Sequence, residues 1–147
     1  MAKLTTIGFT QKNLETFVAL LRRAGATKVV DIRLRPSSQL SGYAKPDDLR
    51  FVLALFDLAY VHRPSLAPSA ALLDGYRKTR DWESYARAYT DLVVARGALA
   101  DLMREAADHQ VVSLLCSEHL PDRCHRRLLA ELFVAEHREY ELEHLVR

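Results

Sequence analysis

The chain has 147 residues, of which 49% are hydrophobic and 27% charged, and its formal net charge is +2. This composition is typical of one soluble globular domain, and the nearly balanced charge gives no argument for nucleic-acid binding. No apolar run approaches the ~20 residues that cross a bilayer, and the first residues lack the apolar stretch of a signal peptide. We therefore predict a cytoplasmic protein without a membrane partner.

Strand and helix patterns alternate along the chain. β-branched and apolar runs predict strands at residues 3–9, 27–32, 59–62, 111–115 and 140–146. Helical spacing predicts helices at residues 14–24, 46–58 and 122–136, with two or three more between 70 and 108. Asn13 and Asp81 are the expected N-caps, whereas Gly25 and Gly97 are expected to end helices. Loops are expected at residues 34–45 and 63–69.

This order of elements predicts an α/β fold in a single domain over residues 1–147. The sheet is expected to be mostly parallel, with four to five strands and with helices on both faces. Trp82, Tyr85 and Tyr89 recur at i, i+3 and i+7, which indicates core packing on one helix. In an open parallel sheet, ligands bind beyond the carboxyl ends of the strands. Residues at those ends are therefore the first candidates for a functional site.

Polar and reactive side chains follow four of the predicted strands. They are Thr10 after the first strand, Asp31 and Arg33 after the second, His62 and Arg63 after the third, and Cys116 and Glu118 after the fourth. Because the carboxyl ends of parallel strands meet at one edge of the sheet, we expect these side chains to share one cleft.

Four short patterns carry a resemblance to a known family. They are T-I-G from Thr6, D-I-R-x-x-P from Asp31, Y-x-H-x-P from Tyr60, and C-x-E-x-x-P-x-x-C-H-R from Cys116 to Arg126. With these patterns the chain resembles the uncharacterised family known as domain of unknown function 488. The resemblance spans essentially the whole chain. It implies a cytoplasmic, prokaryotic α/β domain, and it assigns no activity.

The two cysteines lie on either side of a strand-to-helix junction. Cys116 ends the fourth strand, and Cys124, His125 and Arg126 open the following helix. The positive end of a helix dipole and neighbouring cations lower a thiol pKa, so Cys124 and Cys116 are candidate nucleophiles. The alternative is that both thiols and His125 pack against the sheet as core residues. In a chain without an export signal, the two cysteines are expected to be reduced.

A zinc site made of Cys116, Cys124, His125 and His62 is a further alternative. The C-x7-C-H spacing matches no common structural zinc pattern, and adjacent residues on a helix point in different directions. We therefore predict no metal and no cofactor.

Arginine and the remaining polar residues suggest anion binding at the same junctions. Guanidinium groups bind phosphate or carboxylate bidentately, so Arg33, Arg63 and Arg126 are the predicted anion ligands. Three further residues, His125, Asp31 and Thr10, are expected beside the ligand. The structural alternative is a salt bridge from Arg33 to Asp31 or from Arg126 to Glu118. His62 and Glu118 are the candidate general acid–base groups.

Taken together, these features predict a cleft that binds or acts on a nucleotide, a nucleic acid or another phosphorylated ligand. One alternative is a thiol-dependent sulfur-transfer or redox protein. The other is a non-catalytic module that binds nucleic acid or protein. The sequence leaves open whether the domain is catalytic, and it does not indicate an oligomeric state.

Overall fold

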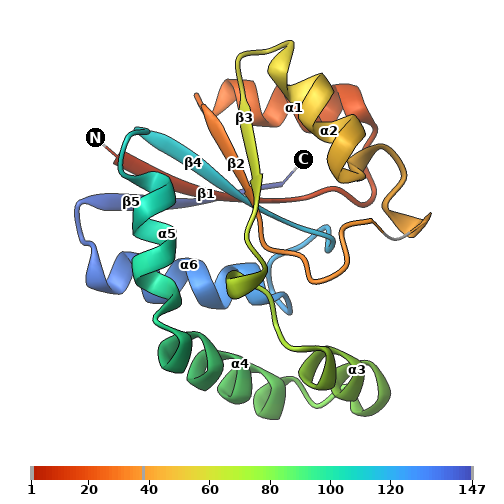
Figure 1. Cartoon of the computed structure of the whole chain (residues 1–147), viewed down its shortest axis with the longest axis vertical. Helices are drawn as coiled ribbons and strands as arrows, with labels where there is room; N and C mark the ends of the chain where they lie inside the picture. The colour runs from red at the N-terminus through yellow and green to blue at the C-terminus, as the bar shows by residue number, and fades with distance from the viewer. Residues whose placement is uncertain (1, 38, 147) are drawn as a thin grey trace.

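The computed structural model describes residues 2–37 and 39–146 and contains one five-stranded sheet. The strands are β1 (Ala2–Gly8), β2 (Lys28–Asp31), β3 (Ala59–His62), β4 (Val111–Cys116) and β5 (Tyr140–Leu145). Their order in the sheet is β3-β2-β4-β1-β5, and every neighbouring pair is parallel. The predicted α/β fold with a parallel sheet is confirmed (Figure 1).

Helices connect successive strands and cover both faces of the sheet (Figure 1). They are α1 (Leu14–Arg23), α2 (Pro46–Ala54), α3 (Ala70–Thr79), α4 (Trp82–Arg96), α5 (Ala98–Ala106) and α6 (His125–Glu136), with short 3₁₀ turns η1 (Gln39–Ala44) and η2 (Pro64–Leu66). The longest helix of the described residues, α4, has 15 residues. None of the helices in this part of the chain is long and apolar enough to cross a membrane.

The helix ends follow the capping residues expected from the sequence. The Asn13 side chain accepts a hydrogen bond from the Thr16 backbone N–H at 2.8 Å, and Asp81 caps α4 in the same way. Gly97 has φ 69°, a left-handed conformation that glycine adopts without strain, and it separates α4 from α5.

Two helix boundaries differ from the prediction by three or more residues, and both predicted loops contain a short 3₁₀ turn. Helix α2 ends at Ala54 instead of residue 58, because the chain turns back through Asp57 at φ 60°. Helix α6 begins at His125 instead of residue 122, because a turn closed by the Cys124 N–H and the Pro121 carbonyl precedes it. The predicted loop at residues 34–45 contains the 3₁₀ turn η1.

The core has two parts, one on each face of the sheet. On one face, Phe17 and Leu21 of α1 and Leu49 of α2 pack with buried strand residues such as Ile7 and Val29. On the other face, buried residues of α4, α5 and α6 pack against Leu4, Val30 and Leu114. Burial of these apolar surfaces is the main stabilising contribution to the fold. Tyr85 and Tyr89 are buried, as their helical spacing predicts, whereas Trp82, which was predicted with them, is only partly buried.

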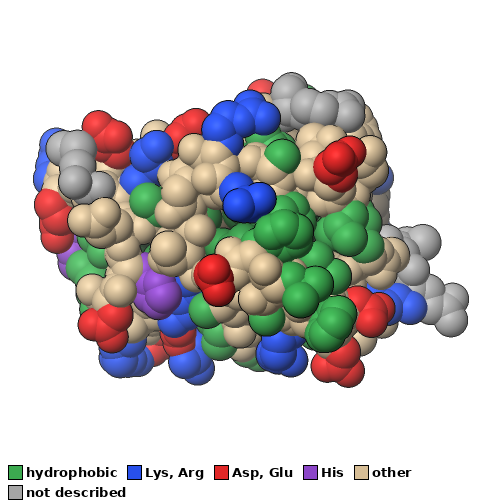
Figure 2. Space-filling model, turned by 90° about the horizontal axis from the view of Figure 1, so that it is seen from above, with side chains coloured by type: hydrophobic (Ala, Val, Ile, Leu, Met, Phe, Trp, Pro, Cys, Tyr) green, Lys and Arg blue, Asp and Glu red, His purple; other side chains and the backbone are tan. Residues whose placement is uncertain are grey.

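The face that carries α1 and α2 also presents hydrophobic side chains to solvent. Figure 2 shows such side chains gathered on this side of the molecule. The large exposed ones from this region are Phe51, Leu55 and Phe56, of which Phe51 is 67% exposed. Helix α2 turns Phe51 toward solvent, and its opposite side supplies the core residues Leu49 and Leu53.

Candidate functional site

A cleft of about 370 Å³ opens beyond the carboxyl ends of β2 and β4, which are neighbours in the sheet. One wall is formed by Arg33, Leu34 and Arg35 after β2, and the floor by residues after β4 and at the start of α6. Helix α3 and the start of α4 close the opposite side with Leu73, Tyr76, Arg77, Arg80 and Tyr85. This is the edge at which parallel α/β sheets bind ligands.

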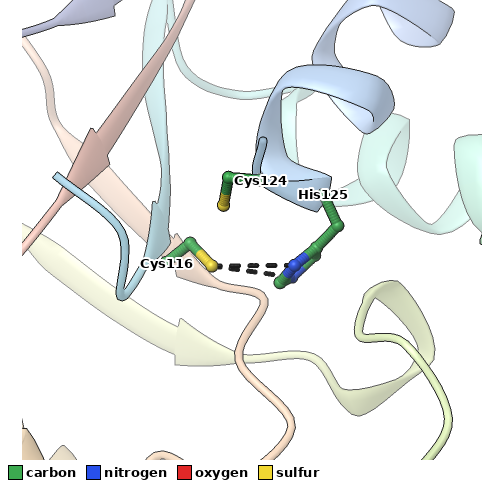
Figure 3. A group of neighbouring side chains, drawn as sticks. All are labelled: Cys116, Cys124 and His125. Atoms are coloured by element: carbon green, nitrogen blue, oxygen red, sulfur yellow. Dashed lines mark hydrogen bonds between the residues drawn. The ribbon is translucent and has the colours of Figure 1, made fainter. Parts of the chain in front are cut away.

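The floor of the cleft holds the two cysteines and His125 (Figure 3). The Cys116 Sγ atom lies 3.7 Å from His125 Nδ1 and 3.8 Å from Nε2. One ligand atom from each of Cys116, Cys124 and His125 lies within 4.8 Å of the others, and all three residues are buried. The His125 Nε2–H donates to the Ile32 carbonyl at 2.8 Å, which fixes the ring against β2.

The backbone conformation of Cys124 brings these three groups together. Cys124 is the N-cap of α6 and has extended backbone angles, φ −136° and ψ 141°. The expectation that Cys124 occupies the first helical turn, and therefore points away from His125, is wrong. Because Cys124 is extended and only His125 is helical, their side chains are not separated by the fixed angle between neighbouring residues of a helix. Both side chains therefore reach the floor of the cleft.

Burial and hydrogen bonding distinguish the two thiols. The Cys124 thiol donates a hydrogen bond to Cys116, and this donation holds the pKa of Cys116 well below its ordinary value. Burial and the same hydrogen bond raise the pKa of Cys124. Burial lowers the pKa of His125, but the negative charge of Cys116 and the hydrogen bonds to Cys116 and to the Ile32 carbonyl together outweigh burial, so the net shift is upward. The opposite shifts of the two thiols favour negative charge on Cys116 over negative charge on Cys124.

Arg33 is 3% exposed, and protein groups occupy most of its donors. Its Nε and Nη2 donate to the two oxygens of Asp31 at 2.8 and 2.7 Å, and Nη2 also donates to the Ala44 carbonyl at 2.6 Å. The Tyr60 hydroxyl donates to the same carboxylate. The predicted salt bridge with Asp31 is therefore present, and Arg33 contributes one edge of its side chain to the cleft wall.

Arg126 is fully buried and holds the loop after β4. Its guanidinium donates to the backbone carbonyls of Glu118 and His119 and to the Thr6 hydroxyl. The partner in Glu118 is the backbone oxygen, so the expected carboxylate salt bridge is replaced by a backbone contact. Arg126 shapes the cleft from behind, and the exposed Glu118 side chain lies on the cleft wall.

Five candidate residues are absent from the cleft lining, namely Asp31 and Arg126, which lie behind it, and His62, Arg63 and Thr10. The His62 Nε2 is 2.7 Å from the Arg33 carbonyl, and Arg63 forms an ion pair with Glu105. The Thr10 hydroxyl donates to the Ser117 carbonyl at 2.8 Å and borders a neighbouring hollow that shares Glu118 with the cleft. The structure thus brings together Cys116, Cys124, His125, Arg33 and Glu118, with Asp31 and Arg126 behind them.

Four further arginines, which are not in the predicted set of site residues, line the cleft: Arg35, Arg77, Arg80 and Arg123. Arg35 pairs with Asp74 on the surface. Among the residues that the structure describes, Arg77, Arg80 and Arg123 take part in no ion pair. The i, i+3 spacing of Arg77 and Arg80 was a visible signal that both project from one side of a helix end, but nothing local placed that end opposite β4.

Comparison with known proteins identifies the family. The model of the family described as domain of unknown function DUF488 matches residues 13–133. The chain belongs to this family. The match confirms the resemblance carried by the D-I-R, Y-x-H and C-x-E patterns, all of which lie within the matched residues. No curated protein and no solved structure matches the chain.

Proposed function

We propose that this member of the DUF488 family binds a small phosphorylated ligand, with a nucleotide as the first choice, in the cleft between β2, β4 and α3. The observation that supports the proposal is the excess of positive charge in the lining of the cleft. The described lining contains five arginines but only one carboxylate, that of Glu118. Three of these arginines form no ion pair with any of the described residues. Unpaired guanidinium groups that converge on one cavity are suited to bidentate phosphate recognition.

The size of the cavity favours a small molecule over a nucleic-acid chain. Its volume of about 370 Å³ lies at the lower end of the ~300–1,000 Å³ that is typical of small-molecule sites. The nearly balanced net charge of +2 gives no argument for binding a phosphate backbone.

The apolar part of the lining favours a ligand with a flat, uncharged portion. Leu34, Pro68 and Leu73 contribute aliphatic surface, and Tyr76 stacks on Tyr85 with ring centroids 4.7 Å apart. Two tyrosines held in this way present a rigid aromatic surface to the cavity. A nucleoside phosphate combines a flat base with an anionic group, which matches both parts of the lining.

Calorimetric titration tests this proposal. The probes are ADP, GMP, inorganic phosphate, adenosine and a 5′-phosphorylated single-stranded oligonucleotide, all in buffer containing EDTA. We expect ADP or GMP to bind, adenosine to bind at least tenfold more weakly, and the oligonucleotide to bind no better than the mononucleotide. Preference for the oligonucleotide with a steep salt dependence would instead support the nucleic-acid module.

Matched arginine variants locate the binding site. One charge-assisted hydrogen bond contributes about 1.5–3 kcal/mol, so Arg77→Gln and Arg123→Gln should each weaken nucleotide binding by roughly 10- to 100-fold. The control is Arg138→Gln, an exposed arginine between α6 and β5 at the other end of α6. The proposal fails if no phosphorylated probe binds, or if Arg138→Gln weakens binding as much as the cleft variants do.

A further inference from the structure

We propose that Cys116, Cys124 and His125 bind a zinc ion whose fourth coordination position faces the arginine-lined cleft. The proposal goes beyond the proposed function and does not depend on it. It starts from the floor of the cleft, where two sulfurs and one imidazole nitrogen lie within 4.8 Å of one another (Figure 3). All three residues also border the cavity, so one side of the group is open to a small ligand.

The separations between these atoms match those around a tetrahedral metal ion. Zinc bonds of about 2.3 Å to sulfur and about 2.1 Å to nitrogen place the two ligand atoms roughly 3.6 Å apart. The observed separation of Cys116 Sγ and His125 Nδ1 is 3.7 Å. The sulfur is almost equidistant from Nδ1 and Nε2, so a rotation of the ring is needed to direct Nδ1 at the ion.

The hydrogen bond from His125 to β2 prepares the imidazole for this role. A histidine that binds a metal through one nitrogen usually donates the other ring N–H to a carbonyl or carboxylate. Here Nε2 is 2.8 Å from the Ile32 carbonyl, so Nδ1 is the ring nitrogen that remains for the ion. The carbonyl belongs to the residue that follows β2, so the edge of the sheet supplies the partner of Nε2.

The chemistry of the ligands selects the kind of metal. Two thiolates and one neutral imidazole are soft and borderline ligands, which favour Zn²⁺ over Mg²⁺ or Ca²⁺. Binding displaces to solvent the protons that the sulfurs and Nδ1 carry, and two thiolates neutralise a divalent ion, so the loaded group carries no net charge in its buried position. Three protein ligands with one open position are typical of zinc sites that bind a ligand or a water molecule, whereas structural sites are closed by four protein ligands.

Cobalt spectroscopy tests the site on the unmodified chain. The protein is reduced with a phosphine, stripped with a chelator and titrated anaerobically with Co²⁺. We expect one equivalent to produce thiolate-to-cobalt charge-transfer absorption with the visible bands of tetrahedral cobalt, and one equivalent of Zn²⁺ to abolish both. Absence of the charge-transfer band at excess Co²⁺ would overturn the proposal, and this measurement needs no variant.

Variants identify the ligands. Cys116→Ser, Cys124→Ser and His125→Gln should each lower Zn²⁺ affinity at least 100-fold in competition with a chromophoric chelator. The matched control is His109→Gln, because His109 is hydrogen-bonded to Thr27. Thr27 precedes β2, at the end of the strand opposite to the cleft. Equal affinity of wild type and Cys124→Ser would also overturn the proposal.

The proposal of a metal site and the proposal of a nucleotide site can be refuted independently of each other. The double variant Arg77→Gln/Arg80→Gln should retain the cobalt spectrum of the wild type while its nucleotide binding is weakened. Conversely, nucleotide titrations in EDTA proceed without any metal. A normal cobalt spectrum without nucleotide binding would remove only the proposed function, and nucleotide binding without a cobalt spectrum would remove only the metal site.

Discussion

Replacing Gly8 with alanine should disrupt the loop that forms the cleft floor. Gly8 ends β1 and lies opposite Cys116 in the sheet. A Cβ atom at this position would lie 1.6 Å from the Glu118 carbonyl oxygen and 2.7 Å from Arg126 Nη1. These two groups are hydrogen-bonded to each other, so the added methyl meets a fixed contact rather than a flexible side-chain end.

The cost follows from the movement that the methyl requires. The carbonyl must shift by about 2 Å to restore an ordinary van der Waals contact, which breaks its bond to Arg126. Overpacking contributes roughly 1–3 kcal/mol, and a lost hydrogen bond to a charged group contributes about 1.5–3 kcal/mol. We therefore expect Gly8→Ala to lower the free energy of unfolding by about 3–5 kcal/mol, a large part of the ~5–15 kcal/mol available to a domain.

Urea denaturation followed by circular dichroism measures this loss. The control is Gly75→Ala within α3, where an added Cβ meets nothing within 4 Å. Alanine is the better helix former, so the control should be more stable than wild type by up to about 1 kcal/mol. A Gly8→Ala protein within about 0.5 kcal/mol of wild type would refute the reasoning, because the carbonyl held by Arg126 would then not occupy the space beside Gly8.

Three further substitutions test other contacts. Arg80 caps α3 at φ 57°, a left-handed conformation that glycine adopts without strain, so Arg80→Gly should raise the free energy of unfolding in urea by about 0.5–1 kcal/mol. Because the same substitution removes a cleft arginine, it should weaken nucleotide binding roughly tenfold in calorimetry. Burial opposes ionisation of Glu105, but its hydrogen bonds to Lys28 and Arg63 lower its pKa. The contribution of ionised Glu105 to stability is present above the unfolded pKa of about 4.3 and is lost as the pH falls through the folded pKa. Glu105→Gln should therefore lower the free energy of unfolding by about 2 kcal/mol at pH 7, and by progressively less toward pH 3, in urea titrations. Burial and the charge of Arg126 lower the pKa of His144, so wild type should lose stability as pH falls through about 6.5, and His144→Gln should lose less between pH 7 and pH 5.

Local patterns were sufficient to predict the elements of the fold. Alternation of short apolar runs with helical spacing located all five strands, and β3 has the predicted bounds. Caps such as Asn13 and Asp81 act through neighbouring backbone N–H groups, so their effect is readable from a few residues. Boundaries such as the start of α6 were missed because a turn closed by a backbone hydrogen bond leaves no side-chain signature.

The candidate site was only partly readable because its geometry depends on distant segments. Strand ends placed Cys116 and Glu118 at the cleft, since strand direction is a local property that all parallel strands share. Arg77 and Arg80 are brought there by the packing of α3, about 40 residues before Cys116 in the chain. The extended backbone of Cys124, which lets two adjacent residues share one floor, is likewise set by tertiary packing.

The position of each arginine determines what its mutation can reveal. Arg33 and Arg126 are buried, and their donors hold Asp31 and the carbonyls of Glu118 and His119. Truncating either one leaves buried acceptors unsatisfied, which costs stability whether or not a ligand binds. Exposed Arg77 carries no such structural bond, so its removal changes the charge of the cleft while the loops stay in place. Loss of binding in an Arg77 variant therefore bears directly on recognition, whereas the same loss in an Arg126 variant bears first on the loop that forms the cleft floor.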